Sequence, residues 1–446
     1  MNDPILTNKV MPKKPDFKEA LLFWIKLGFI SFGGPAGQIA IMHEYLVDKK
    51  KWISNSKFLH ALNYCMILPG PEAQQLATYI GWMLHGTRGG LAAGILFFLP
   101  SMFILLALSL IYVSYGNIPW IYAMFNGLKP AVIAIVILAL IKIGKKSLLS
   151  PFHILVALAA FVGIYFFNLP FPLIILGTIL IAAFGRKVFP AVFQTQQSGN
   201  KIAEDESDYY INKDSIVGNT SFNPALFWKK SMIAALLWII PLITFYFFTA
   251  DFQFWKNLTV FFTKASLVTF GGAYAVLPYV AQVSVEKFNW LTNLQMIDGL
   301  ALGETTPGPL IMVLVFVGFM AGHNHFGNSL SMGTLGLITT TFYIFLPCFL
   351  FIFAGAPIIE RTQENKMVKE ILSIVTAAVV GVILNLTIYL GQAVLFPNEV
   401  SLSGIDYVAL GWGIVSFIGL FRFKIGMISW IGLSALFGLI SYLFAY

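Results

Sequence analysis

Residues 26–34 read K-L-G-F-I-S-F-G-G, and residues 264–272 read K-A-S-L-V-T-F-G-G. These two stretches lie 238 residues apart. The same spacing, without a gap, relates Trp52 to Trp290, Pro69-Gly70-Pro71 to Pro307-Gly308-Pro309, and His85 to His323. After a short insertion the spacing becomes 247 residues and relates Pro100 to Pro347. Membrane segments share Phe, Gly and Leu by chance, but a gapless register of Lys, Trp, His and Pro-Gly-Pro indicates two homologous repeats.

The composition places these repeats in a lipid bilayer. Of the 446 residues, 58% are apolar and only 11% are charged, against about 25% charged residues in an ordinary soluble domain. Such high hydrophobicity also excludes a disordered chain. A spanning helix takes about 20 apolar residues, and the apolar segments lie near 17–42, 58–84, 90–115, 119–141, 151–167, 170–185, 225–249, 255–283, 295–322, 330–357, 370–394, 404–421 and 425–445.

These segments predict an all-α polytopic membrane protein built from two six-segment repeats. The predicted parts are a cytoplasmic tail (1–16), an N-terminal repeat (17–185), a hydrophilic linker (186–223), a linking transmembrane helix (224–250) and a C-terminal repeat (251–446). If each repeat crosses the membrane an even number of times, the single linking helix inverts the second repeat. Inverted repeats are a common plan of secondary transporters.

The distribution of Lys and Arg indicates the orientation of the chain. The net charge is +8, but the basic residues lie in short loops, as expected for cytoplasmic loops and not for a nucleic-acid-binding face. A cytoplasmic N-terminus brings the major basic loops to the cytoplasm and the C-terminus outside, in a multi-pass protein of the inner (plasma) membrane. These loops contain Lys142, Lys145, Lys146, Arg186, Lys187, Arg361, Lys366, Lys369, Arg422 and Lys424.

One basic cluster bears on how the first two segments cross. If residues 17–42 crossed fully, the basic cluster would lie outside, against the positive-inside rule; it consists of Lys49, Lys50, Lys51 and Lys57. They return to the cytoplasm if residues 17–42 and 58–84 are both re-entrant hairpins. The sequence favours hairpins, and full crossings stay an alternative.

The FGG and PGP motifs interrupt their apolar segments near the middle. Glycine permits backbone angles that other residues avoid, and proline ends one helix and suits the start of the next. We therefore expect half-helices to begin at Pro35, Pro71 and Pro309. Their N-termini carry free N–H groups and about half a positive charge, which suits an anion. The predicted backbone donors are Gly33, Gly34, Gly70, Gly271, Gly272 and Gly308; the alternative is that these glycines only let helices kink or pack.

Ionisable residues within membrane segments are candidates for function. Lys26 and Lys264 are equivalent and precede the FGG motifs, where each would add positive field to an anion site; the alternative is that they snorkel to the interface. Glu72 follows Pro71 near a helix N-terminus, where it could instead cap that helix. Glu304 lies near a helix C-terminus, where a carboxylate is disfavoured. We expect Glu72 and Glu304 to gate the site or carry protons.

Several classes of protein are disfavoured by the sequence. No P-loop motif is present, so direct use of ATP is not expected. The six histidines lack metal-site spacing, and Cys65 and Cys348 are expected to be packing residues without a disulfide. We expect no enzyme activity, metal or cofactor, since no catalytic cluster of His, Asp or Cys is present.

The run from Ser31 to Gln38 (SFGGPAGQ), Trp52-Ile53, and the run from His60 to Trp82 resemble the chromate ion transporter family. Residues 269–274 and 303–309 resemble its C-terminal repeat. The resemblance covers nearly the whole chain and implies the long, two-domain form, which exports chromate across the bacterial inner membrane with oppositely oriented halves. It implies a secondary transporter that confers chromate resistance. A transporter or channel for sulfate or another inorganic anion stays an alternative, and a homodimer is not decided by the sequence.

Overall fold

The computed structural model describes residues 14–445 except 33, 189–205, 213–214, 216–222, 250, 271, 363–365, 398 and 400. This described part is helical, apart from one isolated β-bridge between Ile53 and Ile211. It contains six helices that are long and apolar enough to cross a membrane, namely α4, α5, α8, α13, α14 and α16. The predicted all-α polytopic membrane fold is confirmed.

The helices before α8 (Pro224–Phe248) and those after it follow a similar order along the chain. The first set is α1 (Phe17–Ile30), α2 (Gly34–His43), η1 (Glu44–Lys49), α3 (Asn55–Cys65), α4 (Glu72–Tyr115), α5 (Pro119–Ser147), α6 (Pro151–Tyr165) and α7 (Phe171–Val188). The second set is α9 (Phe252–Leu267), α10 (Ala273–Gln282), η3 (Val283–Lys287), α11 (Asn293–Thr305), η4 (Leu310–Met312), α12 (Val313–His325), α13 (Leu330–Thr362), α14 (Lys366–Leu395), η5 (Leu402–Gly404), α15 (Tyr407–Phe421) and α16 (Met427–Ala445).

Local details recur at the spacing of 238 residues. Lys51 and Asn289 both adopt a left-handed backbone, with φ of 52° and 51°. Three residues later, the Ser54 and Thr292 hydroxyls cap the N-termini of α3 and α11. A π-helical turn, η1 or η3, precedes each of these loops. Such matching of turns and caps is the relation expected of two copies of one fold.

The apolar segments that carry FGG and PGP are each divided into two helices at the motif. Helices α1 and α2 have 14 and 10 residues, fewer than the roughly 20 that a crossing needs. The Lys50 ammonium lies 2.6 Å from the Glu19 carboxylate, so the end of η1 returns to the start of α1. The rings of Phe23 and Tyr45 stack with centroids 4.0 Å apart. The α1–α2 unit therefore turns back on itself, while its re-entrant insertion stays a prediction.

The α3–α4 unit returns to the same place. Helix α4 bends at His85 and Gly86, where Gly86 has a φ of 64°. The His85 Nε2 atom lies 2.9 Å from the Pro15 carbonyl oxygen, immediately before α1. In the second repeat, the His325 Nε2 atom at the end of α12 lies 2.8 Å from the Asp251 carboxylate before α9. Each repeat thus closes its paired units at the base where its first helix begins.

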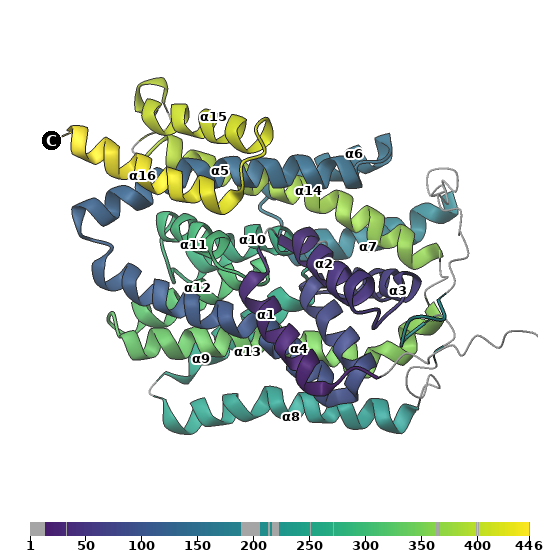
Figure 1. The fold of residues 1–446 in the computed structure, drawn as a ribbon. Helices are drawn as coiled ribbons and strands as arrows, with labels where there is room; N and C mark the ends of the chain where they lie inside the picture. Colours follow the sequence, from purple (N-terminus) through teal and green to yellow (C-terminus); the bar gives the residue numbers. More distant parts are fainter. Residues whose placement is uncertain are drawn as a thin grey trace, which may run out of the picture.

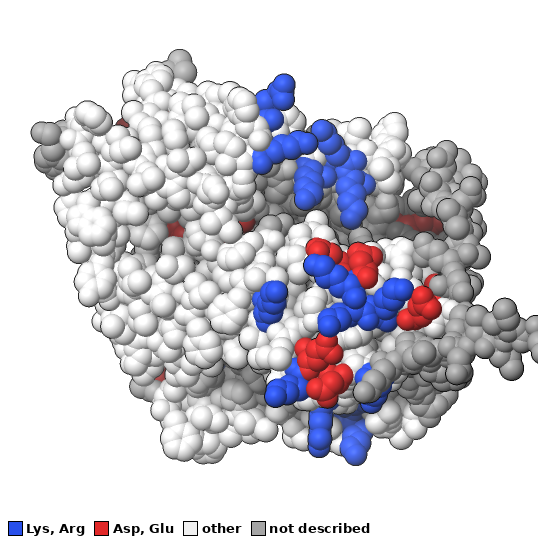
Figure 2. Space-filling view, viewed as in Figure 1, with Lys and Arg blue, Asp and Glu red and all other residues white. Residues whose placement is uncertain are grey.

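Helix α8 links the two bases. In Figure 1 it runs along the lower edge, from the linker side at the right to the start of α9 at the left, and the C-terminus also lies at the left. Within α8, which is described in full, only Phe245 is buried. Figure 2 shows Lys and Arg side chains gathered in the right half of the same face, with the left half almost free of them. The bases of the two repeats therefore lie toward opposite ends of the molecule.

Part of the hydrophilic linker packs against the first repeat. The Tyr210 and Ile211 amides donate to the Lys51 and Trp52 carbonyls at 3.1 and 3.0 Å, and the Ser54 amide donates to the Ile211 carbonyl at 2.8 Å. The Ile211 side chain is buried in the core formed by the first helices. The sequence predicts only an exposed linker here, because the composition of the whole stretch masks one apolar residue.

We expect Ile211→Ala to release this linker segment. Truncating a buried Ile to Ala lowers stability by about 2–5 kcal/mol. The free energy of locally opening this segment should fall by a comparable amount, and that free energy sets the exchange rate of the amides that the segment protects. Hydrogen exchange at the Tyr210 and Ile211 amides should accelerate by about tenfold or more. Ile240→Ala, at an exposed position of α8, is the control and should leave these amides unchanged. Equal exchange in both variants would show that Ile211 does not hold the segment.

Candidate functional site

The four glycines of the FGG and PGP motifs that are described all have a left-handed backbone. Their φ angles are 72° at Gly34, 119° at Gly70, 100° at Gly272 and 92° at Gly308. An L-residue with a side chain rarely adopts these angles. The two other glycines expected to act as donors, Gly33 and Gly271, lie outside the described residues.

Helices begin at each proline singled out in the sequence. Helix α2 begins at Gly34, directly before Pro35, while α4 follows Pro71 and η4 follows Pro309. The N-terminus of α4 has no side-chain cap, and neither does that of α10 at Gly272. Backbone N–H groups at these ends are therefore not used by local side chains.

Two reciprocal hydrogen bonds join the two repeats at their FGG and PGP loops. We call these loops, residues 31–34 and 69–71 of the first repeat and 269–272 and 307–309 of the second, the tips of the repeats. The Gly70 amide donates to the Thr269 carbonyl at 2.8 Å, and the Gly308 amide donates to the Ser31 carbonyl at 2.8 Å. Gly70 and Gly308 are equivalent at the 238-residue spacing, as are Ser31 and Thr269. Each PGP loop thus contacts the FGG loop of the other repeat, which is the pattern of an approximate two-fold axis between the tips.

The PGP glycines are tightly packed, whereas the last FGG glycines face open space. A Cβ atom on Gly70 would lie 2.8 Å from the Cys348 Sγ atom, and one on Gly308 would lie 3.0 Å from the Ser101 Cβ atom. Ser101 and Cys348 are equivalent at the 247-residue spacing. A Cβ atom on Gly34 or Gly272 would meet no heavy atom within 4 Å. Space therefore remains beside the N-termini of α2 and α10.

Uncharged polar side chains complete the tips. The Gln38 amide nitrogen donates to the Gly308 carbonyl at 2.6 Å, and that of Gln75 donates to the Pro69 carbonyl at 2.7 Å. The Ser31 hydroxyl and the amide oxygens of Gln74 and Gln75 are buried without a hydrogen-bond partner. A search for ionisable residues misses these side chains. Their carboxamides within an apolar segment are the signal that could have identified them.

The predicted lysines lie away from the tips. The Lys26 side chain is exposed on α1, and the Lys264 side chain is exposed on α9. Lys264 lines a pocket of about 530 Å³ together with Asn168, Glu286 and Lys287. In the described structure neither Lys26 nor Lys264 forms a salt bridge. The structure therefore brings Lys264 to a pocket and leaves Lys26 on the surface.

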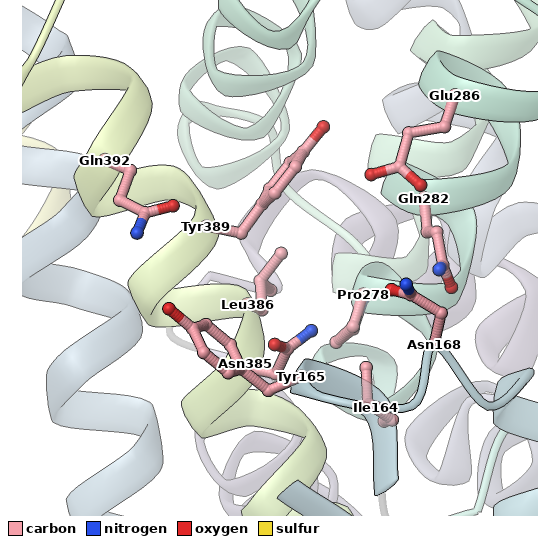
Figure 3. Close-up of a pocket in the computed structure, with 10 residues that line it drawn as sticks. All are labelled: Ile164, Tyr165, Asn168, Pro278, Gln282, Glu286, Asn385, Leu386, Tyr389 and Gln392. Carbon is pink, nitrogen blue, oxygen red and sulfur yellow. The ribbon is translucent and has the colours of Figure 1, made fainter. Parts of the chain in front are cut away.

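A smaller neighbouring pocket of about 160 Å³ shares Asn168, Gln282 and Glu286 with the larger one. Figure 3 shows side chains of α10 and η3 on one side of it and Asn385, Tyr389 and Gln392 of α14 on the other. Neither pocket is lined by a glycine of the FGG or PGP motifs. The two pockets form a hollow of mixed polar and apolar lining at the η3 end of α10, away from Gly272 at its start.

The two predicted carboxylates have different surroundings. Glu72 is half-buried at the first turn of α4. Glu304 is buried at the last turn of α11, where the Tyr274 hydroxyl donates to its Oε1 atom at 2.5 Å. Tyr274 lies in the first turn of α10, so this hydrogen bond ties the two helices that meet at the tip of the second repeat.

No site for a metal is formed within the described ranges, where no three His, Cys, Asp or Glu side chains cluster. Cys65 and Cys348 are both buried and free. The candidate site therefore consists of backbone amides, hydroxyls, carboxamides and a few charged groups.

Comparison with known proteins agrees with this two-fold plan. Residues 18–184 and residues 256–439 both match the family described as Chromate transporter, and the two matched stretches begin 238 residues apart. The chain is 30% identical to a chromate transport protein of Pseudomonas aeruginosa, over 86% of this chain and 84% of that protein. It is 26% identical to a chromate transport protein of Cupriavidus metallidurans, over 88% and 87% of the two chains.

A probable chromate transport protein of Synechococcus elongatus is 25% identical over 89% of this chain and 90% of its own length. No solved structure matches the chain. The matched residues include both FGG motifs and both PGP motifs. They thus include the residues that form the reciprocal hydrogen bonds between the repeats. The chain is therefore a multi-pass membrane protein that belongs to the chromate transporter family.

Proposed function

We propose that this chain is a secondary transporter that exports chromate from the cytoplasm and so confers chromate resistance. The observation that carries the proposal is the meeting of the two repeats at their helix breaks, where Gly70 and Gly308 each donate to the opposite repeat. Non-helical backbone at membrane depth is tolerated only where it is buried in protein or lines a cavity. The chromate transport proteins that the chain resembles support chromate as the substrate.

The chemistry of the tips suits an oxyanion. The N-termini of α2 and α10 offer backbone N–H groups and a positive helix end beside open space at Gly34 and Gly272. The Ser31 hydroxyl has no partner and can donate a further hydrogen bond. Gly33 and Gly271 are proposed as additional backbone donors. The positive charges of Lys26 and Lys264 are proposed to attract the anion as it approaches the tips.

Export of chromate needs no ATP in this scheme. The cytoplasm is electrically negative, and moving one charge across 100 mV is worth about 2.3 kcal/mol. A dianion therefore leaves the cell downhill in electrical terms. Glu72 and Glu304 are proposed to gate the tips or to carry protons through them, and the hydrogen bond between Glu304 and Tyr274 is the contact that such a gate would break.

We propose an inner-membrane orientation with the N-terminus in the cytoplasm and the C-terminus outside. The concentration of Lys and Arg in one half of Figure 2 supports this orientation through the positive-inside rule. The single helix α8, between two repeats whose bases lie toward opposite ends, supports inverted copies. The base of the first repeat then faces the cytoplasm, and that of the second faces outward.

Uptake of labelled chromate into everted membrane vesicles tests the function. Vesicles that contain the protein should take up chromate in a saturable manner that unlabelled chromate preloaded inside accelerates. Sulfate added outside measures the selectivity among tetrahedral oxyanions. Uptake no greater than in vesicles without the protein would refute chromate export. Flux that never saturates and shows no acceleration by counter-substrate would favour an anion channel.

A further inference from the structure

A buried pair of opposite charges lies outside the FGG and PGP motifs. The Lys129 ammonium in α5 lies 3.9 Å from the Asp298 Oδ1 atom in α11, and each side chain is 7% exposed. Lys129 belongs to the first repeat and Asp298 to the second. Among the residues that the structure describes, no other salt bridge joins two groups so deeply buried. Ionisable groups at membrane depth are functional candidates by default.

The pair is poorly compensated as a structural salt bridge. The separation of 3.9 Å is too long for a hydrogen bond, and the Asp298 Oδ1 atom has no hydrogen-bond partner. The Tyr112 hydroxyl donates to the Oδ2 atom at 2.9 Å. The Lys129 ammonium donates instead to Asn126 Oδ1 at 2.7 Å. A buried ion pair offsets its desolvation cost only when its geometry is excellent and its remaining atoms are hydrogen-bonded.

The unpaired oxygen gives the carboxylate a free position for a proton. A proton on Asp298 Oδ1 would leave the hydrogen bond from Tyr112 to Oδ2 intact. Lys129 would then keep its positive charge, stabilised by Asn126 and by the Tyr122 ring, whose centroid lies 5.3 Å from the ammonium. The titratable groups that face Asp298 are Tyr112 of α4 and Lys129 of α5, with Tyr122 of α5 beyond them.

The pair has one exposed neighbour and no equivalent at the positions related by the repeat. Asn126, which accepts the hydrogen bond from Lys129, is exposed on α5. The position equivalent to Asp298 in the first repeat is His60, and that equivalent to Lys129 in the second is Thr376. The Lys–Asp pair is therefore not repeated by the two-fold relation. A charge change here has no counterpart at the equivalent positions of the other repeat.

We propose that Asp298, held by Lys129 and Tyr112, is a proton-binding site of the transport cycle. The step is the reversible addition of one proton from water to the Asp298 carboxylate, which converts a neutral ion pair into a site with one net positive charge. That charge strengthens attraction for a dianion, and loss of the proton weakens it. Coupling of this proton to substrate movement rests on the proposed chromate transport, whereas proton binding by Asp298 does not.

Infrared difference spectroscopy of the purified full-length protein tests proton binding directly. Between mildly alkaline and mildly acidic pH, the wild type should gain the carbonyl band of a protonated carboxylic acid. Asp298→Asn should lose that band, and Glu304→Gln, which removes a different buried carboxyl, should retain it. The double variant Asp298→Asn/Lys129→Met leaves no unpaired lysine, so it carries the test if the single variant fails to fold. A band unchanged by both Asp298 variants, or absent from the wild type, overturns the proposal.

Proteoliposomes that contain a pH-sensitive dye and a clamped membrane potential test the coupling. Wild-type vesicles should move protons together with labelled chromate, and Asp298→Asn vesicles should move chromate while their proton movement falls to that of protein-free liposomes. Proton movement that persists in Asp298→Asn, or wild-type chromate movement without protons, overturns the coupling. A wild type that shows the Asp298 band but moves no chromate would refute the proposed function and leave the proton site standing.

Discussion

Replacing Gly308 with alanine is expected to reduce chromate transport by about tenfold or more. The backbone at Gly308 has a φ of 92°, and holding a residue with a Cβ atom in such a conformation costs about 1–3 kcal/mol. That range corresponds to about 5- to 150-fold in an equilibrium. The new Cβ atom would also lie 3.0 Å from the Ser101 Cβ atom. The loop must shift to relieve this contact, so the hydrogen bond from the Gly308 amide to Ser31 is weakened.

The measurement is the initial rate of labelled chromate uptake into everted vesicles, divided by the amount of protein in the membrane. Gly177→Ala is the matched control, because a Cβ atom there meets nothing within 4 Å and the backbone is helical. Gly70→Ala should reproduce the defect, since Gly70 occupies the equivalent position and donates to Thr269. Normal uptake by both variants would show that the crossed loops are not part of the transport path.

Lys264→Ala is expected to raise the chromate concentration needed for half-maximal transport by about tenfold. A hydrogen bond to a charged group contributes about 1.5–3 kcal/mol, and 1.4 kcal/mol corresponds to tenfold in affinity. We take the lower end of this range because the Lys264 side chain is exposed at the mouth of the large pocket, where water and salt screen it. The effect should therefore shrink as the ionic strength rises.

Lys256→Ala provides the control for Lys264, since Lys256 is also exposed on α9 and does not line the pocket. Lys264→Arg keeps the charge and should retain most of the affinity. The concentration dependence of chromate uptake at low and high salt distinguishes these variants. If Lys264→Ala transports like the wild type at low salt, Lys264 only anchors the chain at the membrane interface and the approach to the tips lies elsewhere.

The repeat and the helix breaks could be predicted from the sequence because both depend on local patterns. Where glycine and proline stand together in the FGG and PGP motifs they break the helix, so helices begin beside Pro35, Pro71 and Pro309 as expected. Single prolines such as Pro100 and Pro130, in contrast, lie inside helices. Equivalence between residues does not specify which of them touch. The contacts of Gly70 with Thr269 and of Gly308 with Ser31 depend on how the copies pack.

The rest of the site was hidden for two physical reasons. Gln38, Gln74 and Gln75 are uncharged, so a search for ionisable residues within apolar segments does not find them. Lys129 and Asp298 are ionisable residues within apolar segments, but 169 positions separate them in the sequence. Their pairing arises only when α5 of the first repeat packs against α11 of the second.

The crossed hydrogen bonds at the tips have a consequence for how such a protein could have arisen. A chain with one repeat would carry a loop amide equivalent to that of Gly70 and a carbonyl equivalent to that of Ser31, and neither would find its partner within the same copy. A half-length ancestor would therefore have to associate with a second copy of itself to form both hydrogen bonds. Fusion of two such genes would keep the two copies together, and α8 is the helix that joins them here.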